Sequence, residues 1–127
     1  MKTLKWRGML LAALSLGVST AWAGETISKN DWVGHMKQSL PAYVCKDGSY
    51  FRSCFSVDAK GCNAAIAEAV DGCVSQMGSK IPAQLNQPED GKKWGEQLGS
   101  CAGTAYEKKL SGKKISNDKC NNPDNWK

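Results

Sequence analysis

Six cysteines are the side chains whose type and spacing bear most directly on chemistry, because a thiol can bind a metal, carry redox chemistry or form a disulfide. Their successive gaps are 8, 7, 10, 27 and 18 residues. A zinc site needs cysteines about two to four residues apart, and a thioredoxin-like or c-type haem site needs C-x-x-C. We therefore expect no metal and no cofactor, but three disulfides in an oxidising compartment. The six are Cys45, Cys54, Cys62, Cys73, Cys101 and Cys120.

The pairing of these cysteines is not decided by their order alone, since six cysteines allow fifteen connectivities. Cys62 and Cys73 are eleven residues apart, about three helical turns, and so share one face of a helix. The next helix follows after a short connection and should run antiparallel, which favours Cys73–Cys101. The other four cysteines lie near one end of the expected bundle. For them we prefer Cys45–Cys62 and Cys54–Cys120.

Catalytic groups are sparse in this sequence. His35 is the only histidine, and no G-x-S-x-G motif accompanies it. No pair of carboxylates stands out as a glycosidase site would require, and no glycine-rich loop follows a strand as a phosphate site would require. We therefore expect that the protein is not an enzyme. A small secreted hydrolase that uses His35 is kept as an alternative.

An aromatic segment with an arginine is the best candidate for a partner-binding surface. Tyr50, Phe51, Arg52 and Phe55 lie within six residues, and Cys54 would staple the segment in place. Aromatic and arginine side chains dominate interface hot spots, and a stapled segment has little entropy left to lose on binding. The alternative is that these rings close the end of a small helical core. By local pattern the segment is either a short strand or a tethered loop.

The front of the chain has the form of an export signal. Lys2, Lys5 and Arg7 precede an apolar run from Met9 to Val18, and Ala21-Trp22-Ala23 offers a cleavage site. We predict that residues 1–23 are a signal peptide cut after Ala23, that 24–127 form a single domain, and that the product is periplasmic or extracellular. No second run reaches the ~18 apolar residues of a membrane span, so we expect no stable membrane anchor.

The distribution of charge gives little support to one class of partner and indicates another. Residues 24–127 hold 14 basic and 12 acidic side chains, a net charge of +2 that gives little support to nucleic-acid binding. Residues 24–90 hold six basic and eight acidic side chains, whereas 91–127 hold eight basic and four acidic. The C-terminal third could therefore prefer an acidic partner, although lysine pairs such as Lys113-Lys114 also serve simply to solubilise a surface.

Three helical segments must position these residues. We expect a first helix at about Lys29–Cys45, with Ser28 as its cap and a kink or split at Pro41. A second should run from its cap Asp58 to Gly78, and a third should start near Pro88. Glycines recur every four residues in the third helix, where we expect close packing within the domain: Gly91, Gly95, Gly99 and Gly103. From Ser111 onward the composition predicts an irregular tail.

The fold class that follows is all-α: a monomeric, disulfide-stapled bundle of three to four helices with an irregular C-terminal tail. In size, signal and disulfides the chain resembles small exported bacterial helical proteins, among them periplasmic immunity proteins and secretion accessories. We therefore predict an exported, non-enzymatic binding module for an unidentified protein partner, working as an inhibitor, an immunity protein or a secretion accessory. A carrier of a hydrophobic ligand is the other alternative to the hydrolase.

Overall fold

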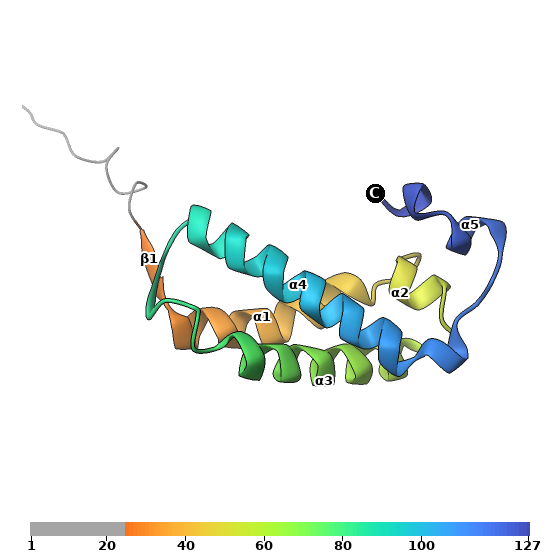
Figure 1. Cartoon of the computed structure of the whole chain (residues 1–127), viewed down its shortest axis with the longest axis horizontal. Helices are drawn as coiled ribbons and strands as arrows, with labels where there is room; N and C mark the ends of the chain where they lie inside the picture. Colours follow the sequence, from red (N-terminus) through yellow and green to blue (C-terminus); the bar gives the residue numbers. More distant parts are fainter. Residues whose placement is uncertain (1–24) are drawn as a thin grey trace, which may run out of the picture.

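Three long helices lie side by side along the molecule (Figure 1). A computed structural model describes residues 25–127, so the expected signal peptide and its cleavage after Ala23 lie outside the described residues. The helices are α1 (Lys29–Val44), α3 (Ala59–Met77) and α4 (Glu89–Lys109). α1 and α4 start at the same end of the molecule, and α3 runs in the opposite direction. The expected all-α, disulfide-stapled bundle is confirmed.

The helices begin where the sequence supplies caps. The Ser28 hydroxyl accepts the backbone N–H of Asp31 at 3.1 Å, and the Asp58 carboxylate accepts that of Gly61 at 2.7 Å. Each bond satisfies one N–H that the first helical turn leaves without a partner. α4 instead has acidic residues in its first turn and lysines in its last, which suits the helix dipole. The predicted bounds of α1 and α3 are confirmed to within a residue.

Pro41 does not split α1, contrary to one expectation. The helix continues through Pro41 to Val44, and the proline ring is buried. Proline removes one N–H from the helix interior, but the bond of the next turn is intact, because the Cys45 N–H donates to the Pro41 carbonyl at 2.9 Å.

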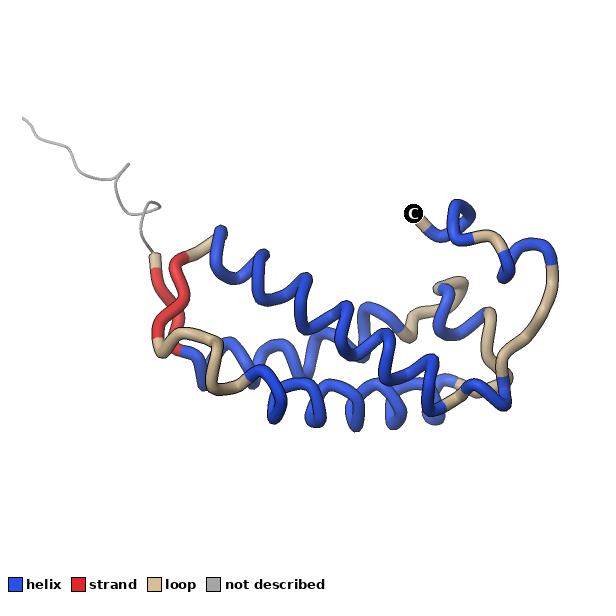
Figure 2. The backbone as a smooth tube through the Cα atoms, viewed as in Figure 1, coloured by secondary structure: helices blue, strands red, loops and turns tan. Residues whose placement is uncertain are grey.

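A two-stranded ribbon that the sequence did not predict joins the starts of α1 and α4 (Figure 2). β1 (Thr26–Ser28) pairs antiparallel with β2 (Gln84–Asn86), and Ile27 lies opposite Leu85. Leu85 is fully buried, so the ribbon covers one end of the core. Three-residue strands carry too short a pattern to be recognised in isolation.

The core forms around one stripe of α3. Apolar side chains at helical spacing along this helix are buried against α1 and α4. Trp32 from α1 and Trp94 and Leu98 from α4 contribute the large side chains that meet the stripe. Burial of such a face is the main source of stability for a helix of this length. The buried residues of α3 are Cys62, Ala65, Ile66, Ala69, Val70 and Cys73.

Three disulfides fasten this arrangement, and their pairs are those preferred from the sequence. Cys73–Cys101 joins α3 to α4, and Cys45–Cys62 joins the end of α1 to the start of α3. Cys54–Cys120 ties the tail back to the body. α3 is therefore stitched to two different neighbours, as the spacing of Cys62 and Cys73 indicated.

The segments beyond the three long helices are short. The aromatic segment, for which the sequence left both a short strand and a tethered loop open, forms one helical turn, α2 (Tyr50–Ser53). Its only strand-like feature is a single antiparallel bridge between Phe55 and Lys114. The tail is irregular, as expected, with turns η2 (Ser111–Lys113), α5 (Asp118–Asn121) and η3 (Pro123–Trp126). The strand interpretation was wrong because closely spaced aromatics indicate burial here rather than an extended backbone.

The glycine row of α4 is closely packed at only some positions. A Cβ atom built at Gly103 would lie 3.2 Å from Cζ of the Phe51 ring, whereas one at Gly99 would meet nothing within 4 Å. A Cβ at Gly91 would also collide with the Gln87 side chain, so close approach occurs near both ends of the row and not along all of it. Across residues 25–127, none of the helices combines the length and apolar character needed to cross a membrane.

Candidate binding site at the aromatic corner

A hollow of about 520 Å³ lies where α2, the last turns of α4 and the C-terminal tail meet. We call its surroundings the aromatic corner. Three aromatic rings, a carboxylate, an ammonium group and an amide line it, together with one end of a disulfide. The lining residues are Tyr50, Phe51, Glu107, Lys114, Cys120, Asn121, Pro123 and Trp126.

Tyr50 is the central polar group of the corner. Its hydroxyl donates to Oε1 of Glu107 at 2.5 Å and accepts from Nζ of Lys114 at 2.8 Å. The phenol therefore lies between a carboxylate and an ammonium group that come from different elements. Both bonds are charge-assisted and fix the orientation of the ring.

The protonation states at the corner follow from these contacts. Partial burial raises the pKa of Tyr50 above its ordinary value of 10.0, and the hydrogen bond to the Glu107 carboxylate raises this pKa further. The hydrogen bond to Tyr50 raises the pKa of Lys114 above 10.5. At neutral pH the corner thus presents a protonated phenol and a charged ammonium group.

The rings of the corner hold one another edge to face. Tyr50 lies 5.2 Å from Phe51, 5.7 Å from Phe55 and 5.6 Å from Trp126, measured between ring centroids. Tyr106, which is fully buried, packs against Phe51 and Phe55 and donates its hydroxyl to the Phe51 carbonyl at 2.7 Å. Such pairs add to the stability that comes from buried area. The wall of the hollow is therefore continuous with the core.

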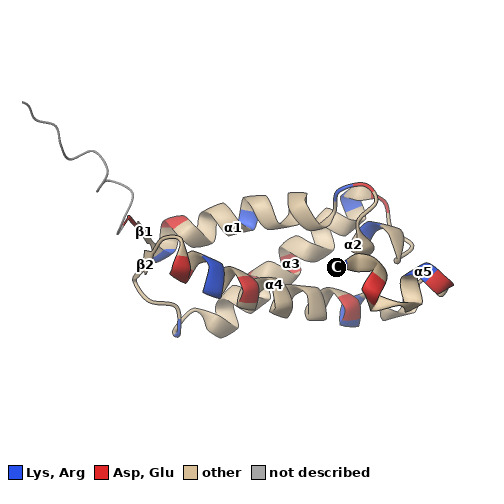
Figure 3. Ribbon diagram, turned by 90° about the horizontal axis from the view of Figure 1, so that it is seen from above, with Lys and Arg blue, Asp and Glu red and all other residues tan. Residues whose placement is uncertain are grey.

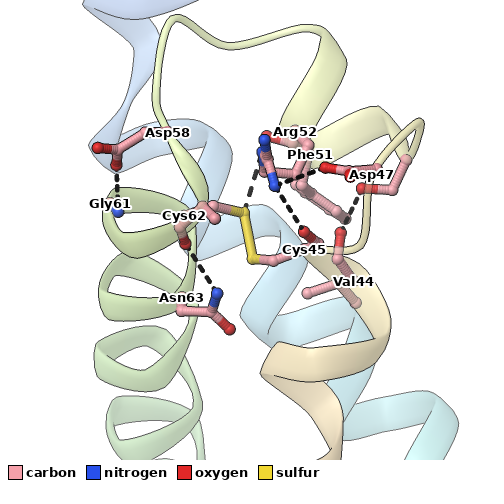
Figure 4. A network of polar contacts seen from close by, with 11 residues as sticks. Val44, Cys45, Asp47, Phe51, Arg52, Asp58, Gly61, Cys62 and Asn63 are labelled. Atoms are coloured by element: carbon pink, nitrogen blue, oxygen red, sulfur yellow. Dashed lines mark hydrogen bonds and ion pairs between the residues drawn. A yellow bond between two sulfur atoms is a disulfide. The ribbon is translucent and has the colours of Figure 1, made fainter.

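α2 is held from its other side by a polar network (Figure 4). The Arg52 guanidinium donates to the Cys45 carbonyl at 3.3 Å and pairs with the Asp47 carboxylate at 3.1 Å. The Ser49 hydroxyl donates to the Val44 carbonyl at 2.6 Å. Together with the Cys45–Cys62 disulfide, these contacts fix the turn between α1 and α2.

The four residues predicted to bind a partner have different places in the fold. Tyr50 and Phe51 line the hollow. The Arg52 side chain, 23% exposed, ties α2 to the preceding turn. Phe55 is 1% exposed and lies in the core, so it cannot touch a partner in this fold. That placement agrees with the alternative interpretation, in which rings close the end of the core.

Glu107, Lys114 and Trp126 were not singled out as site residues from the sequence. Glu107 and Lys114 reach the Tyr50 hydroxyl across 57 and 64 residues of chain. No local sequence pattern predicts contacts between residues so far apart in the chain. The one usable signal was Trp126, an aromatic residue in a polar tail that Cys120 anchors.

His35 lies apart from the corner. It is exposed on α1, and its carbonyl accepts the Ser39 hydroxyl at 2.9 Å. Within residues 25–127, no three His, Cys, Asp or Glu side chains gather as metal ligands would.

A second hollow, of about 900 Å³, follows the seam between α3 and α4. Small side chains form its floor, and the Cys73–Cys101 disulfide lies within it. The Lys109 ammonium pairs with the Glu68 carboxylate across the seam, and both signs of charge line its rims. It is therefore a groove between packed helices without a distinctive charge.

Comparisons with known proteins give one positive result. Neither the curated proteins nor the solved structures include a match to this chain. A family model described as T2SS substrate NttA matches residues 26–114. The match runs from β1 through Lys114, and it leaves out Cys120 and Trp126 in the tail. Because it spans well over half of the chain, the protein belongs to the family of the type II secretion substrate NttA and is a secreted protein.

Proposed function

We propose that this protein is a non-enzymatic binding module that acts after export, as a monomer, and that the aromatic corner is its binding site for a protein partner. The observation that carries the proposal is the hollow itself, where Tyr50, Phe51 and Trp126 are partly exposed but immobilised. Small exported domains need few large side chains at the surface, so a cluster of fixed, accessible rings is the feature that most favours a binding role.

Rigidity is the physical reason why this corner suits binding. α2 is fastened by Cys45–Cys62, and the tail is fastened by Cys54–Cys120. Association costs entropy when side chains and loops become ordered, so a preformed wall of rings retains more of its contact energy. Within this site Phe51 forms part of the wall, whereas Arg52 holds α2 in position through Cys45 and Asp47.

The family favours a partner outside the cell. A type II secretion substrate leaves the periplasm, which supports an inhibitor or binding protein that meets its target after export more than an immunity protein or secretion accessory retained there. Binding is preferred to turnover because the polar groups of the hollow are engaged with one another: the Tyr50 hydroxyl donates to the Glu107 carboxylate and accepts from the Lys114 ammonium group.

Substitution of Trp126 tests the proposal. The side chain lines the hollow from the tail, outside the main core, so Trp126→Ala should leave the bundle folded. We expect it to weaken capture of partners by about 5- to 150-fold, which corresponds to an interface hot spot of ~1–3 kcal/mol. Capture is measured by cross-linking in native culture fluid, with thermal melts as the folding control.

Tyr43→Ala is the matched control. Tyr43 is the large hydrophobic residue that is most exposed in the described chain, at 69%, and Lys46 lies over its ring at 5.1 Å, but it does not line the hollow. It should capture partners as the wild type does, and so should His35→Ala. Equal capture by the Trp126 variant would place the binding face elsewhere. Turnover of any substrate that depends on His35 would favour the hydrolase.

A further inference from the structure

The charges around the aromatic corner are mostly positive. Residues 107–127 carry six lysines and three acidic side chains. Two of the three carboxylates have a partner within the protein: Glu107 accepts the Tyr50 hydroxyl, and Asp124 pairs with Lys127 at 2.6 Å. The third, Asp118, is exposed at the start of α5. Lys113, Lys114 and Lys119 form no ion pair within the described part of the chain. Over the molecule as a whole, by contrast, both signs are interspersed (Figure 3).

Two of these lysines lie directly on the rings of the corner. Nζ of Lys114 is 5.2 Å from the centroid of the Tyr50 ring, and Nζ of Lys119 is 4.8 Å from that of Trp126. The aromatic faces that could attract a foreign cation thus already hold the protein's own ammonium groups. A cationic ligand would be repelled by them, whereas a carboxylate would be attracted to both.

The hollow between the rings is apolar on its aromatic side and has room for a side chain. Its walls are formed by Tyr50, Phe51 and Trp126, with Pro123 at the edge. These rings are recessed rather than protruding, and each is only partly exposed. A recessed surface suits an inserted side chain better than the flat surface of a lipid bilayer, which is bound by apolar groups that project outward.

We infer that the aromatic corner binds an acidic protein segment, with one apolar side chain of the partner in the hollow and flanking carboxylates on Lys114 and Lys119. This inference rests on the proposed function and names the chemistry of its partner. Lys114, like an ordinary lysine, is charged throughout the neutral range, and its hydrogen bond to Tyr50 raises its pKa further, in agreement with that role. The Glu107 carboxylate accepts the Tyr50 O–H, and the Lys114 ammonium group bonded to the same hydroxyl partly offsets its negative charge.

A random-peptide selection tests this chemistry directly, because it requires no identified partner. Display libraries of twelve-residue peptides are selected on the folded, oxidised full-length mature protein. We expect enrichment of a Phe, Trp or Leu flanked by Asp or Glu. The double variant Lys114→Gln, Lys119→Gln should bind the selected peptides at least 10-fold more weakly, and their affinity should fall as salt rises, because exposed charge pairs are screened.

Lys93→Gln is the matched control, because it too removes an ammonium group that lies over an aromatic ring. Nζ of Lys93 lies 5.1 Å from the Trp94 ring, in the first turns of α4 and so at the opposite end of that helix from the corner. This variant should bind the selected peptides as the wild type does. An equal loss in both variants would show a general charge effect and would overturn the inference.

The outcomes separate this inference from the proposed function. Enriched peptides that lack acidic residues but lose binding in Trp126→Ala would overturn the acidic partner and leave the corner as the binding site. Peptides that bind independently of Trp126 and of both lysines would overturn both proposals, as would a selection without enrichment. Tighter binding to heparin, or to vesicles of anionic phospholipid, with the same lysine dependence would assign the corner to a sulfated sugar or a membrane and overturn the protein partner.

Discussion

The three-helix body and the aromatic corner are stabilised in different ways. In the body, α1, α3 and α4 share a continuous core to which α3 alone contributes six buried residues. In the tail that completes the corner, Cys120 is the single buried residue between positions 115 and 127, and Ile115 and Trp126 are half-buried. The body is therefore held by distributed apolar burial, and the corner by a disulfide, a few polar contacts and edge-to-face rings.

This difference explains how the corner can keep rings accessible. Large apolar side chains are normally buried because their burial drives folding. Where a disulfide supplies the constraint instead, part of the aromatic surface can remain available to a ligand. Because a disulfide replaces apolar burial there, the corner is the region whose structure depends most on the oxidised state of the protein.

Reduction of all three disulfides should have the largest effect, because it removes the constraint on both the three-helix body and the aromatic corner. Each disulfide typically contributes ~2–4 kcal/mol, and a domain of about 100 residues has limited apolar burial. We expect the reduced protein to be largely unfolded near body temperature, as measured by a circular-dichroism melt with and without reductant. A high, cooperative melting midpoint in reductant would show that apolar burial alone holds the body.

Removal of only the tail disulfide should separate the two regions. Cys54 and Cys120 are 66 residues apart, the longest separation of the three pairs. The double variant Cys54→Ala, Cys120→Ala should therefore lose ~3–4 kcal/mol of unfolding free energy, mainly through a freer unfolded chain. Limited proteolysis should cut the tail while the helical signal persists.

Cys73→Ala, Cys101→Ala is the control for that experiment, because it opens the seam between α3 and α4 and leaves the tail attached. Its tail should remain resistant to protease under conditions where the bundle is folded. Early cleavage of the tail in both variants would mean that the corner and the body unfold as one unit.

Alkaline pH should weaken the corner through its tyrosines. Burial raises the pKa of Tyr50 and of Tyr106 above 10.0, and the positive charge of Arg52 partly offsets the rise at Tyr106. A folded-state pKa that is raised gives stability that is complete below the unfolded value and is lost as the pH rises through the folded value. Unfolding free energy should thus fall above about pH 10, the ordinary tyrosine range.

Tyr50→Phe isolates the contribution of the corner to this alkaline loss. The variant retains the ring but cannot ionise, so its unfolding free energy should decline less steeply with pH than that of the wild type. Denaturant titrations at several alkaline pH values make the comparison. An identical decline in the two proteins would assign the whole effect to groups other than Tyr50.

Two glycines of α4 should show the smallest contrast. Gly99→Ala introduces a Cβ into open space and should stabilise the helix by ~0.5–1 kcal/mol. Gly103→Ala meets the Phe51 ring at 3.2 Å, and this ring is packed against Tyr106. We expect this contact to cancel or reverse the stabilisation that alanine gives to the helix at this position. Denaturant unfolding of both variants measures the difference in unfolding free energy. Equal stabilisation would show that the Phe51 ring can shift to accommodate the added methyl group at little cost.

The sequence by itself determined the elements whose signals are local. Ser28 and Asp58 marked the starts of α1 and α3, and helical periodicity showed that Cys62 and Cys73 face inward. Once the helices were placed, the short connection between α3 and α4 favoured Cys73–Cys101. Caps and periodic faces depend on residues a few positions apart, so they can be recognised along the chain.

Only the tertiary structure decided the ribbon and the composition of the corner. β1 and β2 are three residues long, and α1, α2 and α3 lie between them in the sequence. Phe55 is buried, whereas the nearby Tyr50 remains accessible. Glu107 and Lys114 reach Tyr50 from positions 57 and 64 residues away. Contacts of that range depend on how the helices pack and on which cysteines pair, and a site assembled from them exists only once the chain has closed on itself.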